Sequence, residues 1–262
     1  MRALSTAATG MAAQELNVNV ISNNIANMNT IGFKAQRAEF QDLLYTNVER
    51  MGAQSSDTGT IVPTGIQIGS GVKPNAVYRI TEQGSLTSTG NQYDLAINGR
   101  GYFQVQLPSG ETAYTRAGNF APSATGQLVT ADGYTVLPAI TIPSTATAVT
   151  ISATGLVQAT IPGQTTPQTV GQMQLATFFN EEGLDAQGNN LFLVSGASGA
   201  ATVGLPGATG YGSLQQGYTE ASNVDSVTEI TALISAQRAY EMNSKVVNSA
   251  DQMLQTTSQL KQ

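Results

Sequence analysis

Two stretches decide the fold: residues 4–28, LSTAATGMAAQELNVNVISNNIANM, and residues 226–254, SVTEITALISAQRAYEMNSKVVNSADQML. In both stretches apolar residues recur at steps of three and four, the spacing that places them on one face of an α-helix. An apolar repeat of seven residues is a seam for another helix. One such helix at each end of the chain predicts that the ends pair with each other or with copies of the chain, as in a subunit that polymerises.

The expected assembly contacts are the large residues on or beside each repeat. In the first helix they are Leu4, Met11, Val18, Ile21, Ile25 and Met28, and in the second they are Ile230, Leu233, Ile234, Tyr240, Val247 and Leu254. Gln14 and Asn243 interrupt the two repeats with polar side chains. Each is either a tolerated, solvent-facing interruption or a buried polar group that fixes which helices pair.

The ends of the helices carry their own signals. The first helix is expected from about Leu4 to about Ala26. Its end falls in an asparagine-rich stretch that covers residues 22–30. Asparagine tolerates left-handed backbone and bonds nearby backbone groups. This stretch therefore either simply ends the helix or forms a specific loop that bonds a neighbour. The second helix is expected to begin at the capping-box sequence of residues 226–229, or with Asn223 as its cap.

The middle of the chain is typical of short strands. Turn signals at Pro108–Gly110 and Asp132–Gly133 separate alternating apolar runs, which predicts an antiparallel sandwich or barrel-like domain. The expected fold class is therefore α+β, with long N- and C-terminal helices packed as a coiled-coil-like bundle, a central antiparallel β-rich domain and an extended connector. The predicted strands include residues 93–97, 102–107, 140–142, 149–151, 156–157, 173–178 and 191–194.

The connector lies between the first helix and the β-rich domain. Lys34 to Leu44 is expected as a short helix or an extended arm, and Thr46 to Gly71 shows no strong period, because Gly and Pro interrupt it repeatedly. Long irregular stretches in compact proteins are usually functional or flexible. The chain is expected to divide into an N-terminal helical assembly region (1–45), an extended connector (46–71), a β-rich domain (72–220) and a C-terminal helical assembly region (221–262).

The composition excludes several classes of function. Charged residues make up 11% of the chain, the net charge is −6, and no Lys or Arg occurs between Arg116 and Arg238. Nucleic-acid binding needs a basic surface that neutralises phosphates, so that class is excluded. The chain has no Cys and no His, which removes disulfides, Cys nucleophiles, Ser-His-Asp triads and nearly every zinc or haem site. No cofactor is expected.

Three short motifs suggest chemistry but have simpler explanations. Gly99-Arg100-Gly101 lacks the third Gly and the following helix of a phosphate-binding loop, so a tight turn is expected. Glu181, Glu182 and Asp185 lack the spacing of an EF-hand and are expected in a solvated turn. Nothing in the sequence brings Asp94 and Asp132 together as a glycosidase pair. The chain is therefore not expected to be an enzyme.

The sequence also bears on membranes and targeting. No segment approaches 18 consecutive apolar residues, so no membrane insertion is expected. Residues 1–6 open an amphipathic helix and lack the apolar core of a secretory signal. If the protein leaves the cytoplasm, it is expected to leave without cleavage of such a signal.

Several stretches together resemble the axial proteins of the bacterial flagellum, the family of rod and hook subunits. In the terminal regions they are residues 8–13 (ATGMAA), 22–27 (SNNIAN), 29–34 (NTIGFK), 222–225 (SNVD) and 236–245 (AQRAYEMNSK). In the middle, residues 90–105 (GNQYDLAINGRGYFQV) and 114–120 (YTRAGNF) resemble the rod and hook core domain. The length and residues 138–143 (PAITIP) most resemble the subunits of the distal rod.

The resemblance implies a structural subunit of a rigid hollow shaft that transmits torque from the motor to the hook and houses the export channel. It implies a place in the basal body, in a rod that spans the periplasm towards the outer membrane, reached through the flagellar export apparatus. The implied partners are copies of the chain itself, proximal rod and hook proteins, and surrounding ring proteins. It also implies that the terminal helices form the inner layers of the shaft, which adds Asn23, Asn24 and Asn27 to the assembly interface.

The resemblance also gives the connector a role. Residues 46–71 resemble a rod-type segment that many hook subunits lack or shorten. Rods are stiff, whereas hooks bend. We hypothesise that this segment lies across neighbouring subunits and sets the stiffness of the shaft, with four apolar side chains wedged between the subunits: Ile61, Val62, Ile66 and Ile68. A proximal rod or hook subunit is the alternative within the family, and a secreted β-rich binding module or hydrolase is the alternative from another class.

Overall fold

The computed structural model describes residues 2–49, 64–164 and 166–259 and has an α+β fold. Two helices, α1 (Arg2–Ala26) and α2 (Ser226–Gln259), lie at the two ends of the chain, and short strands fill the sequence between them. The chain forms two compact units. The helical unit comprises Met1–Ile25, Gln36–Tyr78 and Ser226–Gln262, and the β unit comprises Ala26–Ala35 and Arg79–Asp225.

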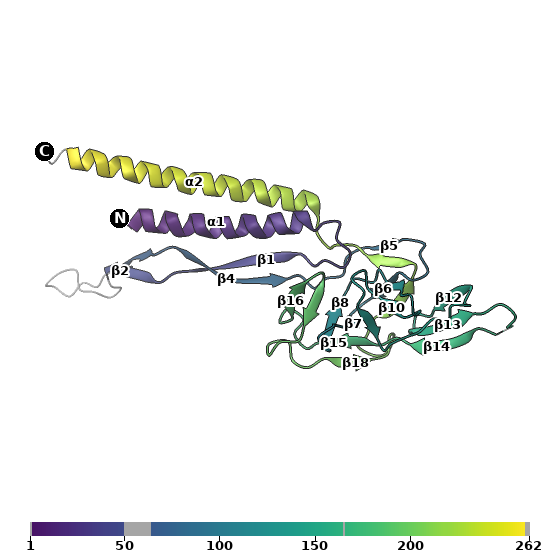
Figure 1. Ribbon diagram of the computed structural model, residues 1–262. Coiled ribbons are helices and arrows are strands. Elements are labelled where there is room, and N and C mark those ends of the chain that lie inside the picture. Colours follow the sequence, from purple (N-terminus) through teal and green to yellow (C-terminus); the bar gives the residue numbers. More distant parts are fainter. Residues whose placement is uncertain (1, 50–63, 165, 260–262) are drawn as a thin grey trace. The chain divides into compact units, whose positions relative to one another are not determined.

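In the helical unit, α1 and α2 run antiparallel beside each other (Figure 1). Both predicted helices are confirmed. The second begins at Ser226, and Asn223 does not cap it, because the Asn223 side chain bonds the backbone of residues 35, 80 and 82.

Two pairs of strands accompany α1 in the helical unit. Strand β1 (Gln36–Asp42) pairs with β4 (Val72–Arg79), and β2 (Tyr45–Glu49) pairs antiparallel with β3 (Ile66–Gly69). Residues 34–44 thus contain the extended arm and not the short helix. The described ends of the 46–71 stretch are paired strands, so the expectation of an irregular connector is wrong there. Backbone pairing of a short alternating run outweighed the Gly and Pro signals.

The β unit is built around one antiparallel sheet of seven strands. Its order is β16 (Asp185–Gly188), β17 (Leu191–Leu193), β8 (Thr112–Thr115), β7 (Phe103–Gln106), β11 (Thr135–Leu137), β10 (Leu128–Val129) and β9 (Ala121–Pro122). Smaller antiparallel sheets are β12-β13-β14 (Ala148–Ile151, Leu156–Thr160, Gln168–Gln172), β15-β18 (Leu175–Thr177, Thr202–Gly204), β19-β6 (Ser213–Gln216, Leu95–Asn98) and β20-β5 (Tyr218–Glu220, Leu86–Ser88).

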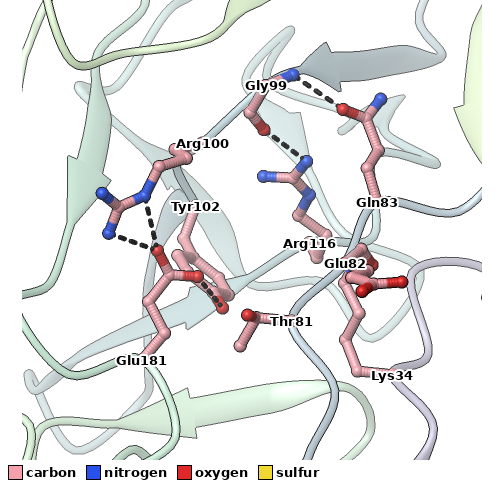
Figure 2. A pocket seen from close by; sticks show the side chains of 9 residues that line it. All are labelled: Lys34, Thr81, Glu82, Gln83, Gly99, Arg100, Tyr102, Arg116 and Glu181. Carbon is pink, nitrogen blue, oxygen red and sulfur yellow. Dashed lines mark hydrogen bonds and ion pairs between the residues drawn. The ribbon is translucent and has the colours of Figure 1, made fainter.

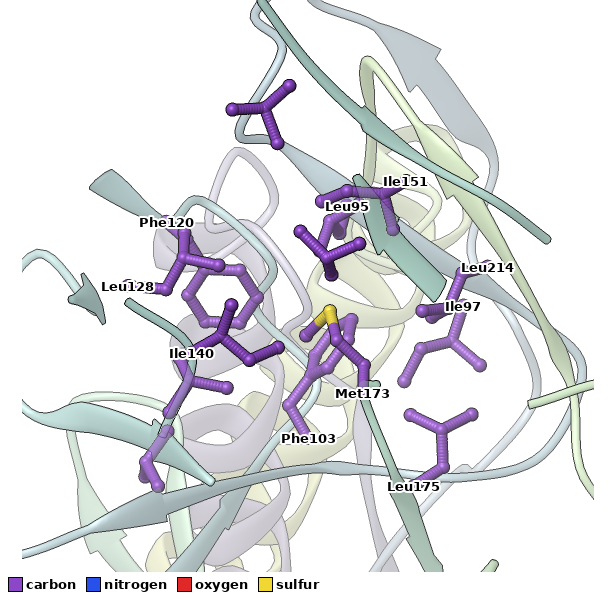
Figure 3. Close-up of a cluster of buried hydrophobic side chains, with 14 of the residues drawn as sticks. Leu95, Ile97, Phe103, Phe120, Leu128, Ile140, Ile151, Met173, Leu175 and Leu214 are labelled. Carbon is purple, nitrogen blue, oxygen red and sulfur yellow. The ribbon is translucent and has the colours of Figure 1, made fainter. Parts of the chain in front are cut away.

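The main hydrophobic core of the β unit brings strands of several of these sheets together (Figure 3). Phe103 lies at its centre, fully buried, with its ring edge-on to Phe120 at 5.0 Å between centroids. Strands β6, β7 and β19 and the segment around Met173 supply inward side chains in the same region. Each fully buried apolar side chain of this size contributes about 1.5–3 kcal/mol. The alternating pattern that predicted a central antiparallel β-rich domain is confirmed.

Some local predictions differ from the structure. Residues 140–142 make a single bridge, between Thr141 and Gln127, and no regular strand. In contrast, the two-residue turn between β16 and β17 was not foreseen. Asn189 and Asn190 both have positive φ there, at 53° and 57°, which is the backbone of a type I′ hairpin turn.

Candidate assembly surfaces

Asn24 joins three elements of the helical unit. Its side chain is almost fully buried, with 1% of its surface exposed. Its Nδ2 donates to the Gln36 carbonyl (2.8 Å) and to Glu229 Oε1 (3.2 Å), and its Oδ1 accepts from the Gln36 amide (2.8 Å). Asn24 therefore ties α1 to β1 and to α2. This contact is within one chain, so this asparagine has a specific structural role beyond ending a helix.

Gly10 forms the second contact between the helices. A Cβ atom built on Gly10 would lie 2.9 Å from Asn243 Nδ2, so the absence of a side chain is what lets Asn243 pack against α1. Fourteen residues separate Gly10 from Asn24, and fourteen separate Glu229 from Asn243. Both contacts therefore fall in one antiparallel register, two heptads apart. On α2, the buried residues Ala236 and Ala250 continue the same seven-residue spacing.

The line of contact between α1 and α2 thus passes through small and polar residues. The predicted repeats of large apolar residues lie beside this line: Met11 follows Gly10, and Ile25 follows Asn24. These two contacts do not test whether large apolar residues also pack between α1 and α2, so the coiled-coil-like bundle stays a prediction. Asn243, which interrupts the apolar repeat of the second helix, is part of the contact with Gly10. This agrees with the interpretation in which its polar side chain helps to fix which helices pair.

Burial separates the sequence-predicted contacts into three groups. Ile21 and Asn24 are buried within the chain; Leu4, Met11, Val18, Ile25, Asn27, Leu233 and Val247 are half-buried; and Asn23, Met28, Ile230, Ile234, Tyr240 and Leu254 are exposed. The exposed apolar residues of α2 also include Met242, Val246 and Met253, which were not among the predicted assembly contacts. Large apolar residues on a helix face water at a cost unless another surface covers them. Helix α2 therefore presents the main unsatisfied apolar surface of this unit.

The strands of the helical unit meet α1 at a second close approach. Gly71 has φ +124°, and a Cβ there would lie 2.2 Å from Thr9 Oγ1. The Val72 amide donates to that hydroxyl (3.3 Å), which itself donates to the Thr6 carbonyl (2.8 Å). Only glycine fits this position. Thr9 and Gly10 of the ATGMAA motif thus serve two different contacts, one to the strands and one to α2.

The predicted stiffness residues are only partly described. Ile66 and Ile68 lie on β3 and are exposed, at 49% and 43% of their surface. They alternate with Gln67, so both isoleucines share one face of the strand. Ile61 and Val62 lie outside the described residues. The described part of this segment therefore presents an apolar face that is about half exposed.

In the β unit, Glu220 is the centre of a buried ionic cluster. Its Oε1 accepts from Lys34 Nζ (2.7 Å) and from the Gly84 amide (2.9 Å), and its Oε2 accepts from Arg116 Nε (2.5 Å). Arg116 also donates to the carbonyls of Gly99 (2.6 Å) and Gly101 (2.5 Å). These three charged side chains are at least 94% buried. Positive φ at Gly99 and Gly101, +112° and +136°, shapes the turn whose carbonyls receive Arg116.

Asn223 completes this arrangement three residues later. Its Oδ1 accepts from the Ala35 amide (2.7 Å), and its Nδ2 donates to the carbonyls of Ile80 (3.0 Å) and Glu82 (3.1 Å). Lys34 Nζ also donates to the Glu82 carbonyl (2.7 Å). Three of the four segments through which the chain enters and leaves the β unit are therefore bonded to one another. The motifs NTIGFK, YTRAGNF and SNVD meet here, whereas Glu220 lies outside the motifs and was missed.

Burial shifts the pKa of two ionisable side chains in or beside this cluster. Burial lowers the pKa of Lys34, and the carboxylate of Glu220 opposes that shift. Burial, followed by the charge of Glu181, raises the pKa of Tyr102. Tyr102 donates its hydroxyl to Glu181 Oε2 (3.2 Å), and Arg100 pairs with the other oxygen of the same carboxylate (2.9 Å). Tyr102 is therefore a neutral hydrogen-bond donor at physiological pH.

A pocket of about 240 Å³ opens beside the cluster, and its lining residues are drawn in Figure 2. Its cations are already engaged: Arg100 with Glu181, and Lys34 and Arg116 with Glu220.

Gly99-Arg100-Gly101 is a tight turn, as predicted. The Asp94 carboxylate accepts hydrogen bonds from the Thr89 hydroxyl (2.6 Å) and the Asn91 side-chain amide (3.0 Å). Its hydrogen bonds therefore stabilise the local turn. The arrangement stabilises a fold and contains no nucleophile aligned with a base.

Two further features of the described residues bear on metal binding and on membranes. Among residues 2–49, 64–164 and 166–259, no cluster of acidic side chains is placed to hold a metal ion. None of the helices in the described part of the chain has the length and apolar character needed to cross a membrane.

Comparison with known proteins places the chain in one family. Residues 4–34 match the description "Flagella basal body rod protein", residues 96–159 match "Flagellar hook protein FlgE/F/G D1 domain", and residues 215–260 match "Flagellar basal body rod FlgEFG protein C-terminal". The first and last of these regions cover most of α1 and α2, and the middle one covers most of the stretch from β6 to β13, which supplies part of the main core.

Full-length relatives agree with these matches. The chain is 68% identical over 261 residues to the flagellar basal-body rod protein FlgG of Caulobacter vibrioides, with all of both chains covered. It is 52% identical to FlgG of Agrobacterium fabrum over 98% of each chain, and 40% identical to FlgG of Bacillus subtilis over 100% of this chain and 99% of that protein. Identity at this level over the whole length shows that the chain belongs to the family of flagellar basal-body rod proteins.

Proposed function

We propose that this chain is the subunit of the distal rod and polymerises into a rigid, hollow helical shaft. The shaft carries torque from the motor to the hook and encloses the export channel. The single observation that carries this proposal is the exposed apolar surface of α2, on residues such as Ile230, Ile234 and Met253. Membership of a basal-body rod family makes copies of the same chain the natural cover for it.

The chain is a structural protein and not an enzyme, because its family builds the rod. Its place is the flagellar basal body. The further partners belong to the proposal: proximal rod and hook proteins at the two ends of the shaft, ring proteins around it, and the flagellar export apparatus, which delivers the subunit without cleaving a signal peptide. The assembly regions are residues 1–45 and 221–262, with the β-rich region at 72–220 on the outside of the shaft.

Electron microscopy of polymers formed by the purified protein tests this function. A straight tube is expected, because a contact between two different surfaces that does not close into a ring grows a helical filament. A curved tube would indicate a hook subunit instead. The absence of any polymer over a wide range of protein concentration would contradict the proposal.

The exposed face of β3 leads to a separate prediction on stiffness. Replacing Ile66 and Ile68 together with serine is expected to give tubes that bend more, because the wedge between neighbouring subunits would lose its apolar contacts. The free energy of unfolding of the monomer should change by less than about 1 kcal/mol, the scale of surface substitutions.

Gln67→Ser is the matched control, because its side chain points to the opposite face of the same strand. Persistence length measured from micrographs is the readout. Tubes of the double variant that stay as stiff as those of the parent would remove the proposed role of this segment, including that assigned to Ile61 and Val62.

A further inference from the structure

Asn98 and Gly99 form the only Asn-Gly pair in the sequence, and the fold requires the glycine. Gly99 has φ +112°, a backbone conformation that residues with a side chain rarely adopt. A Cβ atom there would also lie 2.9 Å from the Cα of Gly212. The Gly99 carbonyl accepts from Arg116 (2.6 Å), so the shape of this turn supports the buried ionic cluster. The turn therefore places the smallest residue directly after an asparagine.

An asparagine followed by glycine is chemically labile. The backbone nitrogen of the glycine attacks Cγ of the asparagine. An N–Cγ bond forms, the Cγ–Nδ2 bond breaks, and ammonia leaves with the proton of the backbone amide. Water then opens the cyclic imide at either of its carbonyls and gives aspartate or isoaspartate. A glycine has no side chain to hinder the attack, and Asn98 is exposed, so water reaches the reacting groups.

Gln83 holds the nitrogen atom that would attack. Its Oε1 accepts from the Gly99 amide (2.8 Å), as Figure 2 shows, and its Nε2 donates to the Ile97 carbonyl (3.2 Å). The backbone amide must lose its proton to become a nucleophile, and the hydrogen bond to Gln83 stabilises the protonated form. Because hydrogen bonds weaken steeply when they bend, the same bond also fixes the direction of the N–H group.

The strand holds Asn98 in a conformation that does not cyclise. Asn98 is the last residue of β6 and pairs with Ser213 of β19. Beyond Gly99, the Arg100 carbonyl accepts from the Gly212 amide (2.7 Å). In extended backbone, with ψ near about +135°, the following nitrogen is turned away from the asparagine side chain. Ring closure therefore requires rotation about the Cα–C bond of Asn98, and that rotation would break the hydrogen bond to Gln83.

We infer that Asn98 is a deamidation site created by the fold, and that the hydrogen bond from Gly99 to Gln83 protects it. Deamidation to isoaspartate would insert an additional carbon atom into the backbone at the end of β6 and shift the Gly99 carbonyl that receives Arg116. Protection of this bond therefore preserves the ionic cluster in an ageing subunit. The inference concerns the chemical lifetime of the folded chain and goes beyond its assembly.

Incubation of the purified full chain in mildly alkaline buffer, followed by peptide mapping, tests this inference. Trypsin releases residues 80–100 as one peptide, in which mass spectrometry measures deamidation and isoaspartate at Asn98. Gln83→Met keeps the length of the side chain and removes the acceptor. It is expected to raise the rate of deamidation at Asn98 about fivefold or more, where fivefold corresponds to about 1 kcal/mol. Gln83→Glu keeps an acceptor oxygen and should stay much closer to the parent rate.

Gln92→Met is the matched control, because Gln92 also accepts from a backbone amide of the β unit, that of Val149 (3.3 Å), and lies in the same peptide. It should leave the rate at Asn98 unchanged. In denaturant, the parent and Gln83→Met should deamidate equally fast, and faster than the folded parent. If Gln83→Met fails to fold, Gln83→Ser removes the same contact with a smaller side chain.

Three results would overturn the inference: equal rates in the folded parent and the folded Gln83 variant, an equal increase in Gln92→Met, or a folded parent that deamidates as fast as the denatured chain. None of these results bears on the proposed function, which polymerisation tests separately.

Discussion

Replacing Glu220 with glutamine is expected to lower the free energy of unfolding of the β unit by about 3–5 kcal/mol, the cost of breaking a buried ion pair by removing one partner. Glu220 is the only carboxylate bonded to Lys34 and Arg116 in the described structure, and both cations are almost completely buried. A glutamine would keep the size of the side chain but leave two buried positive charges without a counter-charge. It would also turn an acceptor towards Lys34 into a competing donor whenever its amide faces that way.

Denaturant unfolding of the monomer measures this change. Glu182→Gln is the matched control, because it removes a charge from an exposed glutamate in the same unit and should change the free energy of unfolding by less than about 0.5 kcal/mol. The double variant with Lys34→Met should lose less than the sum of the two single losses, since the two residues interact directly. A loss below about 1 kcal/mol for Glu220→Gln would show that the cluster does not stabilise the unit.

The second large effect is expected on assembly. Ile230→Asp or Ile234→Asp should raise the concentration needed for polymerisation by at least about a hundredfold, because an unpaired carboxylate would be buried between subunits at a cost of several kcal/mol. The monomer should unfold as the parent does, since both side chains are about half exposed in a single chain.

Asn248→Asp introduces the same charge at an exposed polar position of α2 and serves as the control. Cells that carry Ile234→Asp should assemble no functional flagella, whereas those with Asn248→Asp should swim. Normal swimming of the Ile234→Asp strain would show that this face of α2 is not covered in the rod.

The sequence predicted the elements of the helical unit better than their contacts. The seven-residue pattern located both helices, because helix formation depends on residues a few positions apart. It also offered Asn243 as a polar group that fixes which helices pair, but it named no partner for Gly10 or Asn24, whose contacts with α2 the structure shows. A glycine or an asparagine carries no apolar signal, so its role appears only when the opposite helix is in place.

The ionic cluster shows a second limit. Lys34, Arg116 and Glu220 are separated by 82 and 104 residues along the chain, and nothing local in the sequence relates them. The family motifs contained two of the three, but as marks of identity and not as partners. The paired strands at 45–49 and 66–69 illustrate the same point, because pairing across an intervening segment overrode local Gly and Pro signals. Conversely, the absence of Cys and His needed no structure to exclude most catalytic and metal chemistry.

The most direct test of the account is a helical reconstruction of the polymer at side-chain resolution. The account predicts a straight tube in which the exposed apolar residues of α2, Ile230 and Ile234 among them, are buried against neighbouring copies of the chain. It also predicts that Glu220 remains paired with Lys34 and Arg116 inside each subunit. A polymer in which the α2 face is open to solvent and the subunits meet only through their β units would contradict it.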